Sequence, residues 1–104
     1  MRIIARRRLR EFWEAHPVAK ADPSLRTALD EWYRLVRQEE WTTPAEVKAR
    51  FGAVSIVANC RAVFNICGNK FRLVASIDYP GGIVYIKFIG THKEYDAIDV
   101  ETVE

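Results

Sequence analysis

Apolar residues recur at helical spacing through the first half of the sequence, with polar residues between them. Three segments carry such a stripe and are predicted to be helices: residues 6–16, 21–41 and 42–52. Pro17 ends the first helix, because proline cannot continue the helical hydrogen-bond ladder. Asp22 is the expected N-cap of the second helix, with Pro23 at its first helical position. Thr43 and Glu46 have the spacing of a capping box at the start of the third.

From Val54 onward the pattern changes to β-branched and aromatic residues separated by turn residues. Four strands are predicted there: residues 54–58, 61–66, 71–78 and 83–89. Residues 1–5 could add an edge strand. Helices followed by an antiparallel meander predict an α+β fold, with the N-terminal helices packed on one face of the sheet. Residues 1–104 are expected to form a single domain, because 49% of them are apolar and can fill one core.

The two hairpin loops fix the expected strand register. If the loops CGNK (67–70) and YPGG (79–82) each have four residues, Ile66 pairs with Phe71 and Ile77 pairs with Val84. One face of the sheet is then uncharged and is the predicted core face: Ala62, Phe64, Ile66, Phe71, Leu73, Ala75, Ile77, Val84, Ile86 and Phe88. The opposite face, called the outer face below, mixes polar, charged and small apolar residues: Arg61, Val63, Asn65, Arg72, Val74, Ser76, Tyr85, Lys87 and Ile89.

The outer face gathers the cations Arg61, Arg72 and Lys87, with no carboxylate among them. Asn65 is predicted to lie opposite Arg72, and Val74 opposite Lys87. Guanidinium groups match phosphate oxygens with a planar fork, and lysine adds a point charge. The face is therefore a candidate phosphate-binding surface, at which Tyr85 can also contact a nucleic acid. Alternatively, these cations are solvated surface residues without such a role.

Groups that can move protons follow the last strand, in the stretch FIGTHKEYD (88–96). Gly90 is expected to bend the chain so that His92 and Tyr95 turn toward the cations of the outer face. Histidine has an unperturbed pKa near neutrality, so His92 is the predicted proton-transfer residue, or alternatively a turn residue. Tyr95 could donate a proton, stack on a base, or simply pack against the sheet edge. Glu94 could act as a base or cap the turn.

Composition excludes several other classes of protein. The formal net charge of +2 is too small to indicate a nucleic-acid partner on its own. No apolar run approaches the roughly 20 residues of a membrane span, and no signal peptide is visible, so a cytoplasmic location without membrane contact is expected. Cys60 and Cys67 match no zinc or redox spacing and are expected to be reduced packing thiols. Neither a metal nor another cofactor is predicted.

The predicted surface fits the requirements of metal-independent RNA cleavage. In that reaction the 2′-hydroxyl attacks the adjacent phosphate, which needs a base, an acid and cations near the phosphoryl oxygens. The expected catalytic residues are Arg61, Lys70 and Arg72 for the phosphate charge, and His92 and Tyr95 for protons or base positioning. The expected RNA-binding residues are Asn65, Asn69, Lys87, Tyr85 and Glu94.

Two blocks, NCRAVFNICGNKFRLV (59–74) and GGIVYIKFIGTHKEYDAID (81–99), resemble the HigB-type toxins of bacterial type II toxin–antitoxin systems, within the RelE-like superfamily. The resemblance implies a RelE-like fold and an endoribonuclease, an mRNA interferase that acts commonly on the translating ribosome. It also implies a helix-turn-helix antitoxin of the HigA type, in a hetero-oligomeric complex. The matching polar positions are Arg61, Asn65, Asn69, Lys70 and Arg72 in the first block, and His92, Glu94, Tyr95 and Asp96 in the second.

Two other functions are compatible with the sequence. A non-catalytic inhibitor of translation would bind RNA or the ribosome with the same basic face. A partner-binding module would instead act through its helices and tolerate substitutions on the sheet. The residues alone do not separate these alternatives from an endoribonuclease.

Overall fold

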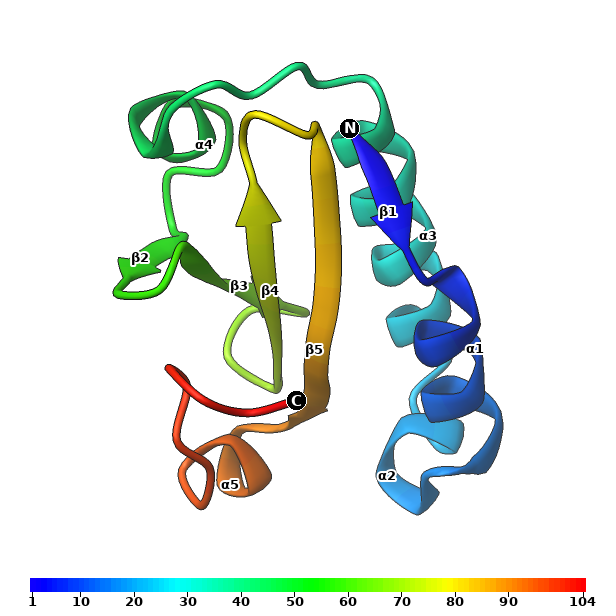
Figure 1. Ribbon diagram of the computed structural model, residues 1–104. Helices are drawn as coiled ribbons and strands as arrows, with labels where there is room; N and C mark the ends of the chain where they lie inside the picture. The colour runs from blue at the N-terminus through cyan, green and yellow to red at the C-terminus, as the bar shows by residue number, and fades with distance from the viewer.

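The computed structural model describes all 104 residues and contains one five-stranded sheet with the order β1-β5-β4-β3-β2 (Figure 1). Its strands are β1 (Arg2–Ile4), β2 (Ser55–Val57), β3 (Arg61–Ile66), β4 (Phe71–Asp78) and β5 (Ile83–Thr91). Strands β2 to β5 form the predicted antiparallel meander, and β1 joins β5 in parallel as the predicted edge strand. The predicted α+β fold is confirmed.

The helices account for most of the remaining chain: α1 (Arg6–Ala15), α2 (Pro17–Lys20), α3 (Pro23–Arg37), α4 (Pro44–Arg50) and α5 (His92–Tyr95). The predicted caps are present, since the Asp22 side chain accepts a hydrogen bond from Ser24 N and Thr43 forms a capping box with Glu46. The single turn of α2 was not predicted. Figure 1 shows α1, α2 and α3 together along one side of the sheet, with α5 following β5. No helix is both long and apolar enough to cross a bilayer.

The core lies between these helices and the predicted core face of the sheet. Its buried cluster includes Leu25, Leu29 and Trp32 from α3 together with residues of β3, β4 and β5. The Trp32 and Phe64 rings meet edge to face, with their centroids 5.3 Å apart, an arrangement favoured by aromatic quadrupoles. Every residue predicted for the core face belongs to this cluster except Phe88.

An irregularity in the β4–β5 pairing explains that exception. Val74 pairs with Phe88, so the predicted pairing of Val74 with Lys87 is wrong, and Lys87 has no partner on β4. One extra residue in a strand reverses the alternation of side chains beyond it. Ile89, predicted for the outer face, therefore packs against the core cluster, whereas Phe88 lies beside Val74 on the outer face.

We expect Leu73→Ala to lower the free energy of unfolding by about 2–5 kcal/mol, because Leu73 is fully buried and its loss leaves a cavity. Ile56→Ala is the matched control, since Ile56 is also in a strand but is 39% exposed, and it should cost less than about 1 kcal/mol. Urea denaturation of both variants measures the difference. Equal losses would contradict the position of the core.

Candidate functional site

Strand β5 and the β3–β4 loop bring polar side chains together at one end of the sheet. The backbone N–H of His92 donates to the carbonyl oxygen of Lys70, at 3.0 Å, which ties α5 to the loop. Arg72 Nη1 donates to Asn69 Oδ1 at 3.3 Å, and Arg72 Cζ lies 5.7 Å from the ring centroid of Tyr95. Asn65 pairs with Arg72 across the strands, as predicted. We call these residues the open cluster: Asn65, Asn69, Arg72, His92 and Tyr95.

Gly90 permits a close approach rather than a bend. Strand β5 continues through Gly90 to Thr91, so the predicted bend at this glycine is wrong. A Cβ atom at Gly90 would lie 2.5 Å from Phe88 Cζ and 3.1 Å from Glu94 Oε1. The absence of a side chain therefore lets Glu94 fold back over the end of β5.

Glu94 is fixed by three hydrogen-bonding contacts that hold α5 in place. Its Oε1 accepts from Thr91 N at 2.9 Å, while Thr91 Oγ1 accepts from Glu94 N at 3.2 Å, which completes a capping box. Its Oε2 lies 3.0 Å from His16 Nε2. His16 Nδ1 accepts from Val18 N, so the ring proton of a neutral His16 lies on Nε2 and is donated to Glu94. The capping role of Glu94, left open from the sequence, is what the structure shows.

The same contacts stabilise the charged form of Glu94. The hydrogen bond from the Thr91 backbone lowers the pKa of this carboxyl group below its ordinary value, and His16 lowers it further, against the opposing effect of partial burial. Glu94 is thus an ionised acceptor near neutral pH. His16, which the sequence placed only on a helical stripe, is 78 residues away and was not predicted to support the site.

His92 pairs with a carboxylate that the residue types did not single out. Its Nδ1 lies 3.2 Å from Asp96 Oδ2, one helical turn further along, and the His92 side chain is half exposed. A carboxylate at one ring nitrogen orients the imidazole, while the other nitrogen can exchange protons. The spacing of four residues could have indicated this pair, had α5 been predicted with certainty.

Lys70 lies at the same end of the sheet but faces a carboxylate. Its Nζ is 3.5 Å from Asp22 Oδ2 at the start of α3. The Ser24 hydroxyl, which donates to Asp22, lowers the pKa of this carboxyl group, and Lys70 adds to the effect. The charge of Lys70, which lies in the β3–β4 loop and not on the outer face, is therefore partly balanced.

The other half of the outer face is covered. Arg61, predicted as an accessible cation, is only 7% exposed, and its Nη1 donates to the carbonyl oxygens of Val100 and Val103. Lys87 Nζ lies 3.4 Å from Glu104 Oε2 and 5.5 Å from the ring centroid of Tyr85. The positive charges of Arg61 and Lys87 are therefore already in contact with the C-terminal residues. The sequence did not predict that the end of the chain returns to the sheet.

The covered half is also distant from the open cluster along the strands. Arg61 and Asn65 are four residues apart on β3, which corresponds to about 13 Å. The guanidinium of Arg61 contacts the C-terminal segment, whereas that of Arg72 contacts Asn69 and Tyr95. The predicted surface thus consists of an open half and a covered half.

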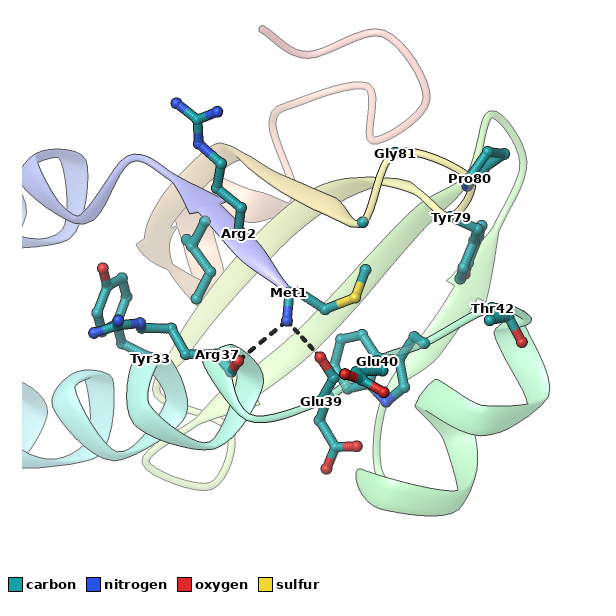
Figure 2. A pocket seen from close by; sticks show the side chains of 13 residues that line it. Met1, Arg2, Tyr33, Arg37, Glu39, Glu40, Thr42, Tyr79, Pro80 and Gly81 are labelled. Atoms are coloured by element: carbon teal, nitrogen blue, oxygen red, sulfur yellow. Dashed lines mark hydrogen bonds between the residues drawn. The ribbon is translucent and has the colours of Figure 1, made fainter.

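The largest cavity, of about 760 Å³, lies at the other end of the sheet, beside the β4–β5 loop (Figure 2). The Met1 ammonium occupies its wall and donates to the carbonyl oxygens of Arg37, at 3.1 Å, and Glu39. None of the residues of the open cluster lines this cavity. Its lining mixes Arg2 and Arg37 with Glu39 and Glu40, and so differs from the purely cationic surface predicted to bind phosphate.

Comparison with known proteins gives a consistent set of matches. A family model described as "HigB_toxin, RelE-like toxic component of a toxin-antitoxin system" matches residues 25–98. The mRNA interferase HigB of Escherichia coli O6:H1 (strain CFT073) is 28% identical over 82 residues, which cover 77% of this chain and 80% of the relative. The mRNA interferase toxin HigB of Escherichia coli K12 is 29% identical over 98 residues, covering 92% and 88%. A Shigella flexneri mRNA interferase HigB matches equally well.

We expect Glu94→Gln to destabilise the protein at pH 7 by less than about 1 kcal/mol, since the carboxylate is half exposed. Because the folded-state pKa of Glu94 is depressed, the advantage of the native residue is complete above the unfolded-state pKa. It is lost as the pH falls below the ordinary carboxyl pKa and through the depressed folded-state pKa of Glu94, because protonated Glu94 resembles glutamine. Urea denaturation of both proteins across this range measures the difference.

The exposed Glu14, which has no ion-pair or hydrogen-bond partner, provides the control variant Glu14→Gln. Its stability should track that of the native protein at every pH. A stability difference for Glu94→Gln that did not change with pH would contradict the proposed capping by the ionised carboxylate.

Proposed function

Because this chain belongs to the HigB family of RelE-like toxins, the toxic components of toxin–antitoxin systems, we propose that it is an mRNA interferase, an endoribonuclease that cuts messenger RNA. The relatives named as mRNA interferases support this activity. The observation that carries the proposal is the open cluster. It places an accessible cation, a histidine paired with a carboxylate, and a phenol at one end of the sheet.

In the proposed reaction the 2′-oxygen of RNA forms a bond to the adjacent phosphorus while the bond from phosphorus to the 5′-oxygen breaks. A base removes the proton of the 2′-hydroxyl, and an acid gives a proton to the departing 5′-oxygen. The products are a 2′,3′-cyclic phosphate and a free 5′-hydroxyl. This chemistry needs no metal, provided that cations balance the charge on the phosphoryl oxygens.

The residues of the open cluster can be given roles in this reaction. The guanidinium of Arg72 can donate two hydrogen bonds to a phosphate, and it lies close to the Tyr95 ring. His92 Nε2 accepts the proton of the 2′-hydroxyl, and Asp96 stabilises the imidazolium that results. The phenol of Tyr95, close to the Arg72 cation, donates to the 5′-oxygen. Asn65 and Asn69 contact the RNA beside the phosphate, and Lys70 adds positive charge.

Membership of this family implies an antitoxin as partner and RNA as target. We propose further that the antitoxin is a helix-turn-helix protein of the HigA type and that the RNA is cut on the ribosome. Both proposals rest on the resemblance of residues 59–74 and 81–99 to HigB-type toxins. A comparison of cleavage on free and ribosome-bound mRNA would test the second.

We expect Arg72→Ala and His92→Ala each to reduce the rate of mRNA cleavage about 10²–10³-fold, because each removes a group that acts on the transition state. Arg34→Ala is the matched control, since Arg34 is an exposed arginine of α3 that has no contact with the open cluster. It should cleave at the native rate. Full activity of both site variants, with unchanged thermal unfolding, would show that the site is wrong.

Mapping of 5′ ends on mRNA from cells that express the protein separates cutting from blocking. New 5′ ends that depend on Arg72 and His92 are the expected result. Stalled ribosomes without new 5′ ends would instead identify a non-catalytic inhibitor of translation.

A further inference from the structure

The last six residues of the chain, 99–104, lie across the covered half of the outer face and are called the C-terminal strap below. Figure 1 shows this segment turning back from α5 toward β5. Four side chains of the protein hold it: Asn59, Arg61, Lys87 and Arg8. Asn59 Nδ2 donates to the carbonyl oxygen of Glu101 at 3.1 Å, and Arg8 Nη2 donates to that of Glu104 at 2.9 Å. The strap lies outside the residues matched by the toxin family model.

The strap provides only part of the hydrogen bonds and none of the negative charge that the buried Arg61 guanidinium requires. Both acceptors of its guanidinium are neutral carbonyl oxygens, those of Val100 and Val103, and Arg61 forms no ion pair. Its Nε is buried and has no hydrogen-bond partner. Burying a cation without a counter-charge is costly, and an unpaired buried N–H adds to that cost. An anion that accepted from Arg61 would therefore bind this site better than the strap does.

A phosphate group has the properties that the strap lacks. It carries negative charge, and its oxygens can accept from Nε and from a terminal nitrogen of a guanidinium at the same time. The strap also resembles an anionic ligand in part, because it contains Asp99, Glu101 and Glu104 and no cation. The carboxylate of Glu104 lies at Lys87, where a second phosphate of a bound strand would be favoured.

An apolar contribution favours closure of the strap when no RNA is bound. Its two valines, Val100 and Val103, are only partly exposed in the closed arrangement. Removing apolar side chains from water is favourable, which helps to explain why a segment that pairs poorly with Arg61 still lies over the sheet.

We propose that the C-terminal strap is a displaceable cover that competes with the RNA backbone for Arg61 and Lys87. The proposal rests on the function proposed above and describes the regulation of that same surface. With the strap closed, RNA contacts only the open cluster. With the strap displaced, the bound strand also reaches the covered half, so the site extends along β3. The measured affinity for RNA then equals the affinity of the open form multiplied by the fraction of molecules in which the strap is open, and this fraction is small.

The test compares the full chain with a chain that ends at Ile98. Binding of a fluorescein-labelled, 2′-O-methylated oligonucleotide is followed by anisotropy, because this RNA analogue cannot be cut. We expect the shorter chain to bind about tenfold more tightly, since no strap must be displaced.

Point variants locate the effect on the proposed contacts. Glu104→Gln should strengthen binding. Glu101→Gln makes the same charge change at an exposed side chain that forms no ion pair, so it should strengthen binding less. In an Arg61→Gln background, truncation should give little gain. Phenylglyoxal labelling, read by mass spectrometry, should modify Arg61 in the shorter chain and spare it in the full chain. If truncation prevents folding, Asn59→Ala with Glu104→Gln loosens the strap in an intact chain.

The outcomes separate this proposal from the proposed function. If the full and the shortened chain are both folded and show equal affinity and equal labelling of Arg61, the proposal that the strap competes with RNA is overturned, even if both chains cut mRNA. Tighter binding by the shorter chain, without cleavage by either chain, would support competition between the strap and RNA and would overturn the proposed endoribonuclease activity. A gain that persisted in the Arg61→Gln background would show that the strap does not act through Arg61.

Discussion

The antiparallel pairing of β3 with β4 is the constraint from which the rest of the structure follows. The four-residue loop between Ile66 and Phe71 sets their register, and the alternation of side chains then commits Phe64 and Leu73 to the core. The same alternation sends Arg72 to the outer face. A slip of one residue would exchange the two sets, burying a cation among the helices and exposing aromatic rings. The helical layer that covers the core face therefore also fixes the side on which the polar residues gather.

Glu94 links that helical layer to the open cluster. Its carboxylate caps α5 through Thr91 and also accepts from His16, at the junction of α1 and α2. The short helix that carries His92 and Tyr95 is too small to be stable by itself, because a single turn gains few hydrogen bonds for the residues it orders. The two carboxylate oxygens of Glu94 anchor this helix at the end of β5, where the Tyr95 ring lies 5.7 Å from Arg72 Cζ. The arrangement of the proposed catalytic groups thus depends on a contact between distant parts of the chain.

The two halves of the outer face differ in how their charges are balanced. At the open end, Arg72 is bonded to a neutral amide and lies over an aromatic ring, so its charge remains available to an anion. At the covered end, Arg61 is buried against backbone carbonyls and Lys87 faces Glu104. The open end is suited to a first contact with RNA, and the covered end becomes useful only when the C-terminal strap moves. A modest net charge can in this way coexist with a cationic surface.

The sequence by itself determined α1, α3 and α4, the caps of α3 and α4, the strands, and the pairing of Asn65 with Arg72, because caps, alternation and short hairpins are local rules. The two stretches that resemble HigB-type toxins, residues 59–74 and 81–99, also contain the polar residues that lie at the end of β5. Only the tertiary structure decided the irregularity that exchanged Phe88 and Ile89, the contact of His16 with Glu94, and the burial of Arg61. Each of these depends on segments far apart in the chain, and their contacts leave no periodic pattern in the sequence. Local patterns therefore specified the side of the sheet that most strand residues face, with Phe88 and Ile89 as exceptions, whereas tertiary packing decided which residues remain accessible.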